Sequence, residues 1–419
     1  MNKNVIWTKG HKIKEFFVFP DDRGGDFVDL IGQIAFVKYF EDVIDPSLHV
    51  EISMLDPFGV INSLPVRSGS SVILKIEHPS QKELLDLTLV ITNITGHVLD
   101  QKREVYNLIC ETKGALSNHT NRVWKKYKDS IHTSVKKIIE EKIDGTIDKK
   151  NIDATSNKLE FYGNYRRPFK TISDLCRKAI PTTSSKGSKN TGSAGYLFFE
   201  TQDGYNFKSI DKIFTGKPQS DVYSMTPFKT GLDPKNNFML ASEPNFRESH
   251  DIIKKLRSGT FSTANYYYNV LTRQVEFNNF KYNSNIKKAN DEDVTPSTYK
   301  DHYSRIILGT LDQGTTMEDK EGVNILTPQD QAKYQAQASA RYSTLFSQTL
   351  DITVPMNLSL RVGQLLKVEF PSINIDNKSD KTSPENGNYL IARLSHEFGN
   401  PDGDYTGLTL VRDSFTIHE

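Results

Sequence analysis

The chain has 419 residues, a formal net charge of +1 and a length that predicts two to four domains. Its 53 basic residues balance 52 acidic ones, so no overall field attracts a polyanion. Two cysteines, Cys110 and Cys176, are too few for a disulfide framework or a four-thiolate zinc site, which indicates assembly in a reducing compartment. A mean hydropathy of −0.52 and the lack of about 18 consecutive apolar residues predict neither a signal peptide nor a membrane segment.

The first third predicts an all-β domain over residues 1–112. Turn residues separate five short β runs at regular spacing, which is typical of a small antiparallel barrel or sandwich. The runs are Ile34–Phe40, His49–Met54, Ser71–Ile76, Leu87–Thr92 and Val105–Cys110.

Helical spacing follows the first domain. Apolar residues three or four apart predict a helix of several turns that ends near Gly145. Its stripe is Trp124, Tyr127, Ile131, Val135, Ile138 and Ile139. A second helix begins at Pro168 and ends before Pro181, and the Ser, Thr, Gly, Lys and Asn residues of 182–193 predict a mobile loop.

The middle of the chain predicts an α+β region over residues 113–225 and 245–345. Two aromatic runs within Tyr196–Lys208 flank Asp203-Gly204, a strong hairpin signal. A short helix ends at Gly259, and a strand pair follows it. The last helix has Thr327 as N-cap and Pro328 at its first position. We expect its narrow apolar stripe, which runs from Tyr334 to Leu345, to pack within its own subunit.

Two segments of the chain resemble each other and suggest an internal repeat. Arg67–Pro79 and Arg361–Pro371 share an Arg-x-Gly turn and then an alternating strand that ends in Pro. The alternative is a chance match, because the similarity is short and needs a gap. We favour a mainly β chain with α+β insertions, in which two similar antiparallel β-barrels surround a helix-containing middle region. The second barrel then spans residues 226–244 and 346–419.

No catalytic motif is evident in the sequence. The ten histidines form no His-Glu-x-x-His pattern, and His396 lies on an alternating strand where a structural role is expected. No Gly-x-Ser-x-Gly elbow occurs, and Gly187–Gly192 lacks the residue order of a phosphate-binding loop.

Metal-binding patterns are equally weak. Asp144–Asp148 and Asp402–Asp404 place carboxylates close together, but neither continues into the bidentate glutamate of an EF-hand. We therefore expect no catalytic residue, no cofactor and no metal ion. A polysaccharide hydrolase stays open as an alternative, because it needs only two carboxylates across a cleft.

Nucleic-acid binding is the other alternative. The segment Trp124–Lys128 interleaves aromatic and basic residues, and small OB-type barrels bind single strands by stacking. Because Trp124 and Tyr127 fall on the predicted apolar stripe, core aromatic residues beside a solvated basic face are the preferred interpretation.

Several segments, in this order, resemble the baseplate hub proteins of contractile-tailed bacteriophages and the related N-terminal hub of type VI secretion spike proteins. An aromatic hairpin leads into a helix, a helix-glycine-aromatic element precedes a strand, and three strands close the last domain. The segments are Tyr196–Ile210, Asp251–Phe261, Val354–Phe370, Asn388–Phe398 and Leu408–Asp413.

The resemblance implies a structural virion protein and not an enzyme. It implies a homotrimer whose two barrels per subunit form a ring with pseudo-six-fold symmetry, which joins the hexameric tail tube to the trimeric cell-puncturing spike. Phage DNA would pass through the lumen, other baseplate proteins would surround the ring, and assembly would take place in the host cytoplasm. Some hub proteins carry a fused lysozyme, and no spare domain for one is visible in this sequence.

Overall fold

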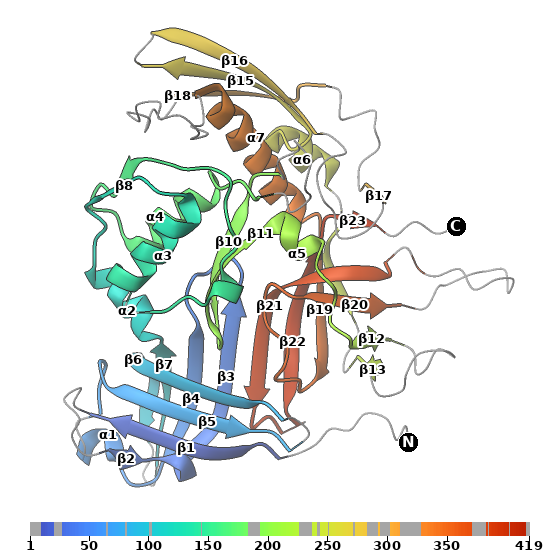
Figure 1. Ribbon diagram of the computed structural model, residues 1–419. Helices are drawn as coiled ribbons and strands as arrows, with labels where there is room; N and C mark the ends of the chain where they lie inside the picture. Colours follow the sequence, from blue (N-terminus) through green and yellow to red (C-terminus); the bar gives the residue numbers. More distant parts are fainter. Residues whose placement is uncertain are drawn as a thin grey trace, which may run out of the picture.

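The computed structural model describes residues 10–20, 27–63, 66–79, 82–99, 103–143, 145–182, 193–225, 237–240, 244–249, 251–270, 273–282, 292–293, 302–310, 328–370, 383, 385–401 and 403–415. The chain is mainly β with several helices (Figure 1). Most strands of both chain ends form the lower part of the view, and most of the helices lie above them.

The largest sheet has fourteen strands, drawn from the first 111 residues and from the chain after residue 221. Its N-terminal strands are β1 (Lys12–Phe19), β2 (Val28–Asp29), β3 (Ile34–Asp42), β4 (His49–Asp56), β5 (Ser71–Glu77), β6 (Leu84–Leu99) and β7 (Glu104–Glu111). The later strands are β12 (Val222–Ser224), β13 (Asn237–Met239), β14 (Asn245–Ser249), β19 (Gln348–Pro355), β20 (Leu365–Glu369), β21 (Gly387–Phe398) and β22 (Tyr405–Arg412). All five β runs predicted in the first third are confirmed, and β1 and β2 are additional.

Alternation along the strands separates a buried face from a more polar one. In β4, Val50, Ile52 and Met54 are buried, whereas the residues between them are partly exposed. Strand β19 repeats the pattern with Leu350 and Ile352. Because successive side chains of a strand point to opposite faces, these alternating sequences bury one face of the sheet and leave the other to water.

The hydrogen-bonded pairing of the described strands does not close into a barrel. The pairing runs as an open path from β13 to β2, with β22, β19 and β14 branching from β21. The strands of the two predicted barrels thus belong to one hydrogen-bonded sheet, and no closed barrel is found among the described strands. The physical reason is the length of β21, whose first residues pair with β20 and whose last residues pair with β3.

A helical region lies above the first strands in Figure 1. It contains α2 (Lys113–Thr120), α3 (Ile131–Lys142), α4 (Pro168–Cys176) and the small pair β8 (Lys126–Tyr127) and β9 (Phe161–Tyr162). The predicted helix from Trp124 is wrong at its start, because Trp124 lies outside any helix and is 58% exposed. Tyr127 is buried, but on strand β8. Helix α4 begins at Pro168 as predicted.

The hairpin predicted within residues 196–208 is confirmed as β10 (Tyr196–Thr201) and β11 (Gly204–Ser209). It packs aromatic side chains against α4, where the rings of Phe198 and Phe169 meet edge to face with their centroids 5.7 Å apart. Helix α5 (Ile210–Phe214) follows directly.

Strands β15 (Ser262–Asn269), β16 (Gln274–Lys281) and β18 (Arg305–Thr310) form a separate sheet at the top of Figure 1. Helix α6 (Ile252–Ser258) precedes them and ends at Gly259, whose φ of 74° confirms the predicted left-handed cap.

Helix α7 (Pro328–Leu345) buries Ala338 and Leu345, so the expected packing within the chain is confirmed. The remaining short elements are α1 (Val60–Ser63), β17 (Glu292–Asp293), β23 (Ser414–Phe415) and the 3-10 turns Ile31–Gln33 and Lys149–Asn151.

Candidate functional site at the junction of two repeated units

Two groups of five strands in the large sheet have the same order and orientation. We call β3, β4, β7, β6 and β5 the first unit, and β14, β19, β22, β21 and β20 the second unit. Within each unit, every neighbouring pair is antiparallel in the order just given.

The register of the central strand pairs, β4–β7 in the first unit and β19–β22 in the second, agrees residue by residue. Val50 pairs with Cys110 in the first unit, and Leu350 pairs with Leu410 in the second, each partner lying 300 positions further on. Both units also have an irregularity at the same place, between Ile91 and Asn93 and between Ile391 and Arg393. A shared bulge at a shared register is a specific feature, because a one-residue slip would reverse every side chain.

The Arg-x-Gly turn is the third shared feature. The N–H of Gly69 donates to the carbonyl of Ile91 at 2.8 Å, and the N–H of Gly363 donates to that of Ile391 at 3.0 Å. Both glycines have positive φ, 101° and 83°, which favours glycine at this position. The sequence resemblance between the two turns therefore corresponds to the same backbone structure.

The two units meet edge to edge. The second half of β21 pairs antiparallel with β3, with Arg393 opposite Asp42 and Phe398 opposite Val37. On the polar side, Arg393 pairs with Asp42 at 2.7 Å and Lys38 pairs with Glu397 at 3.6 Å across this junction.

A buried polar cluster fills the apolar side of the junction. The Glu41 carboxylate accepts hydrogen bonds from the backbone N–H groups of Val362 at 3.0 Å and Gln202 at 3.1 Å, and from the Tyr39 hydroxyl. Burial raises the pKa of Glu41, while the guanidinium of Arg361 opposes that shift. Glu41 belongs to the first unit, Arg361 to the second unit and Gln202 to the hairpin. The cluster therefore connects all three by hydrogen bonds and charge.

His396 lies beside this cluster and is fully buried. Its ring stacks on Tyr39 with centroids 5.6 Å apart, and Nδ1 lies 2.9 Å from the Thr406 hydroxyl. Burial lowers the pKa of His396 to about 3, so the imidazole is neutral at ordinary pH. Its position on an alternating strand predicted a satisfied or exposed histidine, and the structure places it in the interior with Nδ1 beside Thr406.

The hairpin also anchors the helical region to the first unit. The Glu200 carboxylate accepts hydrogen bonds from the Leu48 N–H at 3.2 Å and from the Thr112 hydroxyl at 2.9 Å. Burial raises the pKa of Glu200 to about 7.

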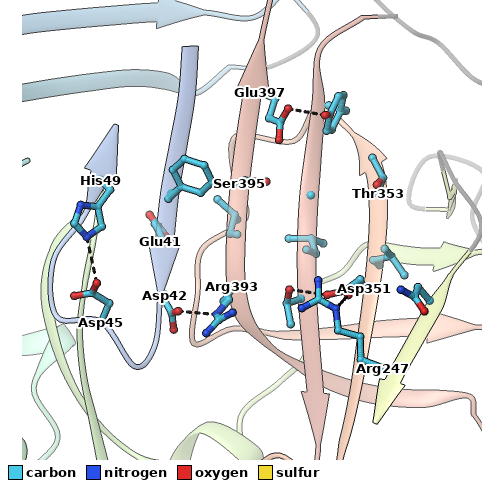
Figure 2. A pocket seen from close by; sticks show the side chains of 18 of the residues that line it. Glu41, Asp42, Asp45, His49, Arg247, Asp351, Thr353, Arg393, Ser395 and Glu397 are labelled. Carbon is cyan, nitrogen blue, oxygen red and sulfur yellow. Dashed lines mark hydrogen bonds and ion pairs between the residues drawn. The ribbon is translucent and has the colours of Figure 1, made fainter. Parts of the chain in front are cut away.

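The polar face of the junction forms a depression of about 670 Å³ (Figure 2). Strands β3, β4, β14, β19, β21 and β22 contribute side chains that alternate with the buried ones. Besides the buried Glu41, the charged residues around it are Asp42, Asp45, His49, Arg247, Asp351, Arg393 and Glu397. The sequence analysis singled out none of them as a site residue, although the alternation Arg393, Ser395, Glu397 along one strand is a signal that could have found two of them.

The charges of this face neutralise one another. Asp351 is paired with Arg247 and accepts a hydrogen bond from the Thr409 hydroxyl at 2.7 Å. Hydrogen bonding to His49 lowers the pKa of Asp45, and the bonds of His49 to Asp45 and Glu111 raise the pKa of that histidine to about 10. A general acid of a glycosidase needs a carboxyl whose pKa is raised, so Asp45 has the opposite electrostatics.

The other sequence candidates are not brought together. Asp404 accepts hydrogen bonds from the N–H groups of His11 and Gly399, and Asp402, Asp144 and the predicted loop 183–192 lie outside the described residues. Both cysteines are buried free thiols. Within the described part of the chain, no three His, Cys, Asp or Glu side chains are placed to hold a metal ion.

Solved structures with the same architecture are tail proteins. A tail protein from Neisseria meningitidis MC58 superimposes with a TM-score of 0.57 and 12% identity, over 96% of this chain and 97% of that one. The 43 kDa tail protein of prophage MuSo2 from Shewanella oneidensis gives 0.56 and 11%, over 97% and 100%. The chain has the fold of phage tail proteins. Prophage tail protein gp18 from Listeria monocytogenes EGD-e agrees, with a TM-score of 0.51 and 11% identity over 95% and 94% of the two chains.

No protein-family model matches the chain, and no curated protein does. The likeness is therefore one of tertiary structure. Among the helices in the described ranges, none combines the length and the apolar character that crossing a membrane requires.

Proposed function

We propose that the chain is a structural protein of a phage tail, the central hub of the baseplate. In this role three copies form a ring with pseudo-six-fold symmetry between a hexameric tail tube and a trimeric cell-puncturing spike. The fold that the chain shares with three phage tail proteins along nearly the whole length supports this assignment.

The observation that carries the proposal is the repeated unit. Two units with the same strand order, the same register and the same bulge lie side by side in one chain. Three such chains present six similar units to the tube. They present three copies of the middle region to the spike. A chain of this kind resolves the mismatch between a six-fold and a three-fold partner.

The polar face of the junction is the proposed lining of the lumen. Its charges form internal pairs, such as Arg393–Asp42 and Arg247–Asp351, and so produce no strong field of one sign. A strongly basic lining would bind DNA phosphates tightly and slow transit. A neutralised lining lets DNA pass.

The domains follow from the same proposal. Residues 1–112 form the first hub domain, residues 226–244 and 346–419 the second, and residues 113–225 and 245–345 the middle region, except that strands β12 and β14 join the sheet of the second hub domain. The middle region, including the sheet of β15, β16 and β18, provides the surface for the spike and other baseplate proteins. The protein acts by assembly and not by catalysis, in the tail baseplate, after assembly in the host cytoplasm.

The test is the mass and shape of the purified protein. Light scattering should give about three times 47.6 kDa, and negative-stain images should show a ring with a central hole. Co-expression with the spike protein of the same phage serves as the second condition, because a spike can complete the trimer. A chain that stays monomeric in both conditions contradicts the proposal, and hydrolysis of cell-wall polysaccharide would then be assayed.

A further inference from the structure

A second depression, of about 360 Å³, lies where the hairpin β10–β11 meets the second unit. The 3-10 turn Lys149–Asn151, the hairpin, the end of α5 and the turn before β20 form its walls. Its lining includes five basic side chains and two carboxylates: Lys150, Lys208, Lys212, Lys217, Arg361, Asp153 and Asp203. The basic side chains therefore outnumber the carboxylates by three.

Lys208 is the most sheltered of these lysines, with 22% of its side chain exposed. Its ammonium donates to the backbone carbonyl of Lys150, a neutral group, and lies 4.0 Å from the Asp153 carboxylate. Burial lowers the pKa of this ammonium, and Asp153 opposes that shift. The positive charges of Lys212 and Lys150 lower the pKa further. The charge of Lys208 is thus incompletely compensated within the chain.

The Asp153 carboxylate already has other donors. Its Oδ1 accepts a hydrogen bond from the Lys212 ammonium at 2.6 Å, and its Oδ2 accepts one from the Ser209 N–H at 3.0 Å. One carboxylate therefore serves Lys208 and Lys212 together. Among the described residues, no carboxylate forms an ion pair with Lys217, which is exposed at the rim. Because each ammonium has three N–H donors, the depression has donors left for an anion.

We propose that this depression binds a diphosphate group. Lysine ammonium groups bind phosphate oxygens as point charges, through charge-assisted hydrogen bonds. A single phosphate group carries about −1.5 to −2 charges near pH 7, so two linked phosphate groups come closer to the excess of three positive charges. The volume falls within the range of about 300–1,000 Å³ that is typical of small-molecule sites. The diphosphate is either free or part of a nucleotide.

Isothermal titration calorimetry of the full chain with inorganic pyrophosphate tests this site. At about 0.15 M salt we expect a dissociation constant below about 1 mM. Lys208→Met removes the sheltered ammonium and keeps an unbranched side chain, so it should weaken binding at least about ten-fold. Lys137→Met on α3, which removes a lysine paired with Asp129 outside the depression, is the matched control and should leave the affinity unchanged.

Asp203→Asn provides a change in the opposite direction. The Asp203 carboxylate is 55% exposed and lies 3.4 Å from Nε of Arg361. Asparagine before Gly204 suits the hairpin turn as well as aspartate does, so the fold should be kept. Removing this negative charge should strengthen pyrophosphate binding about two- to five-fold. A purely structural role of the depression would not produce tighter binding.

ADP distinguishes the two sources of the diphosphate. Equal affinities for ADP and pyrophosphate support a free diphosphate, and an affinity for ADP at least about ten-fold higher supports a nucleoside diphosphate. If Lys208→Met does not fold, Lys217→Gln at the exposed rim replaces it and should weaken binding about two- to five-fold. The proposal is overturned if neither ligand binds, or if the depression variants bind as the unmodified chain does. Because the depression lies within one chain, these outcomes do not depend on whether the ring forms.

Discussion

The two units have the same backbone turn but place its arginine in different surroundings. In the second unit Arg361 is buried, lies 4.0 Å from Glu41 and donates to the Gln202 side chain at 3.0 Å. The counterpart in the first unit, Arg67, is exposed. The hairpin β10–β11 makes the difference, because its turn residues Gln202 and Asp203 lie against Arg361.

The repeat preserves the backbone of the two units and changes the side chains. Strand order, register, bulge and glycine conformation are preserved, and all of them are backbone features. The side chains at equivalent positions serve different purposes: those of the second unit seal the junction within the chain. In the first unit the matching Arg67 stays exposed.

The largest expected effect comes from removing the buried arginine. Arg361→Ala leaves the buried Glu41 carboxylate without its cation, and breaking a buried pair in this way costs about 3–5 kcal/mol. Arg67→Ala is the matched control and should change the free energy of unfolding by less than about 0.5 kcal/mol. Urea unfolding followed by circular dichroism measures both. Equal losses would show that the two turns contribute alike, and the comparison would fail.

The two glycines allow a second, smaller test. A Cβ on Gly363 would lie 2.5 Å from the ring of Phe199, whereas one on Gly69 would have no heavy atom within 4 Å. Gly69→Ala should cost about 1–2 kcal/mol, because its positive φ is strained for alanine. Gly363→Ala adds a steric conflict with the hairpin and should cost about 2–4 kcal/mol in all. The unfolding midpoints of the two variants in urea give the difference directly, and a Gly363 variant as stable as the Gly69 variant would contradict the close packing.

Local signals predicted many elements of this fold. The β runs of the first third alternate in the printed sequence, Pro168 marks the start of α4, and Gly259 marks the end of α6. The one misplaced helix start has a clear reason. Trp124 and Tyr127 have helical spacing relative to Ile131, but residues 126–127 pair with residues 161–162 instead. The pairing of β8 with β9 determines the structure here, although the spacing of the apolar residues in the sequence is that of a helix.

The junction could not be predicted in the same way. It pairs residues 37–42 with residues 393–398, which are separated by most of the chain. The repeat was visible through Arg67 and Arg361, yet nothing local indicates which edge of which copy meets the other. That information lies in the length of β21, which has room for β20 and β3 along one edge.

The smallest expected effect concerns the polar face and depends on pH. His49 of the first unit lies between Asp45 and Glu111, and its counterpart in the second unit is Thr349. The two carboxylates raise the pKa of His49 to about 10 in the folded chain, above the value of about 6.5 in the unfolded chain. The folded state therefore holds this proton more tightly, and its stabilising contribution is complete below pH 6.5 and disappears as the pH rises through about 10. Because the side chain is 37% exposed, solvent screening limits the contribution to under about 1 kcal/mol.

His49→Gln should lower the free energy of unfolding by that amount at pH 6 and by progressively less toward pH 10, while Thr349→Val should shift it equally at both pH values. A His49→Gln deficit that does not shrink with pH would mean that the imidazole stabilises the face by packing and not by charge.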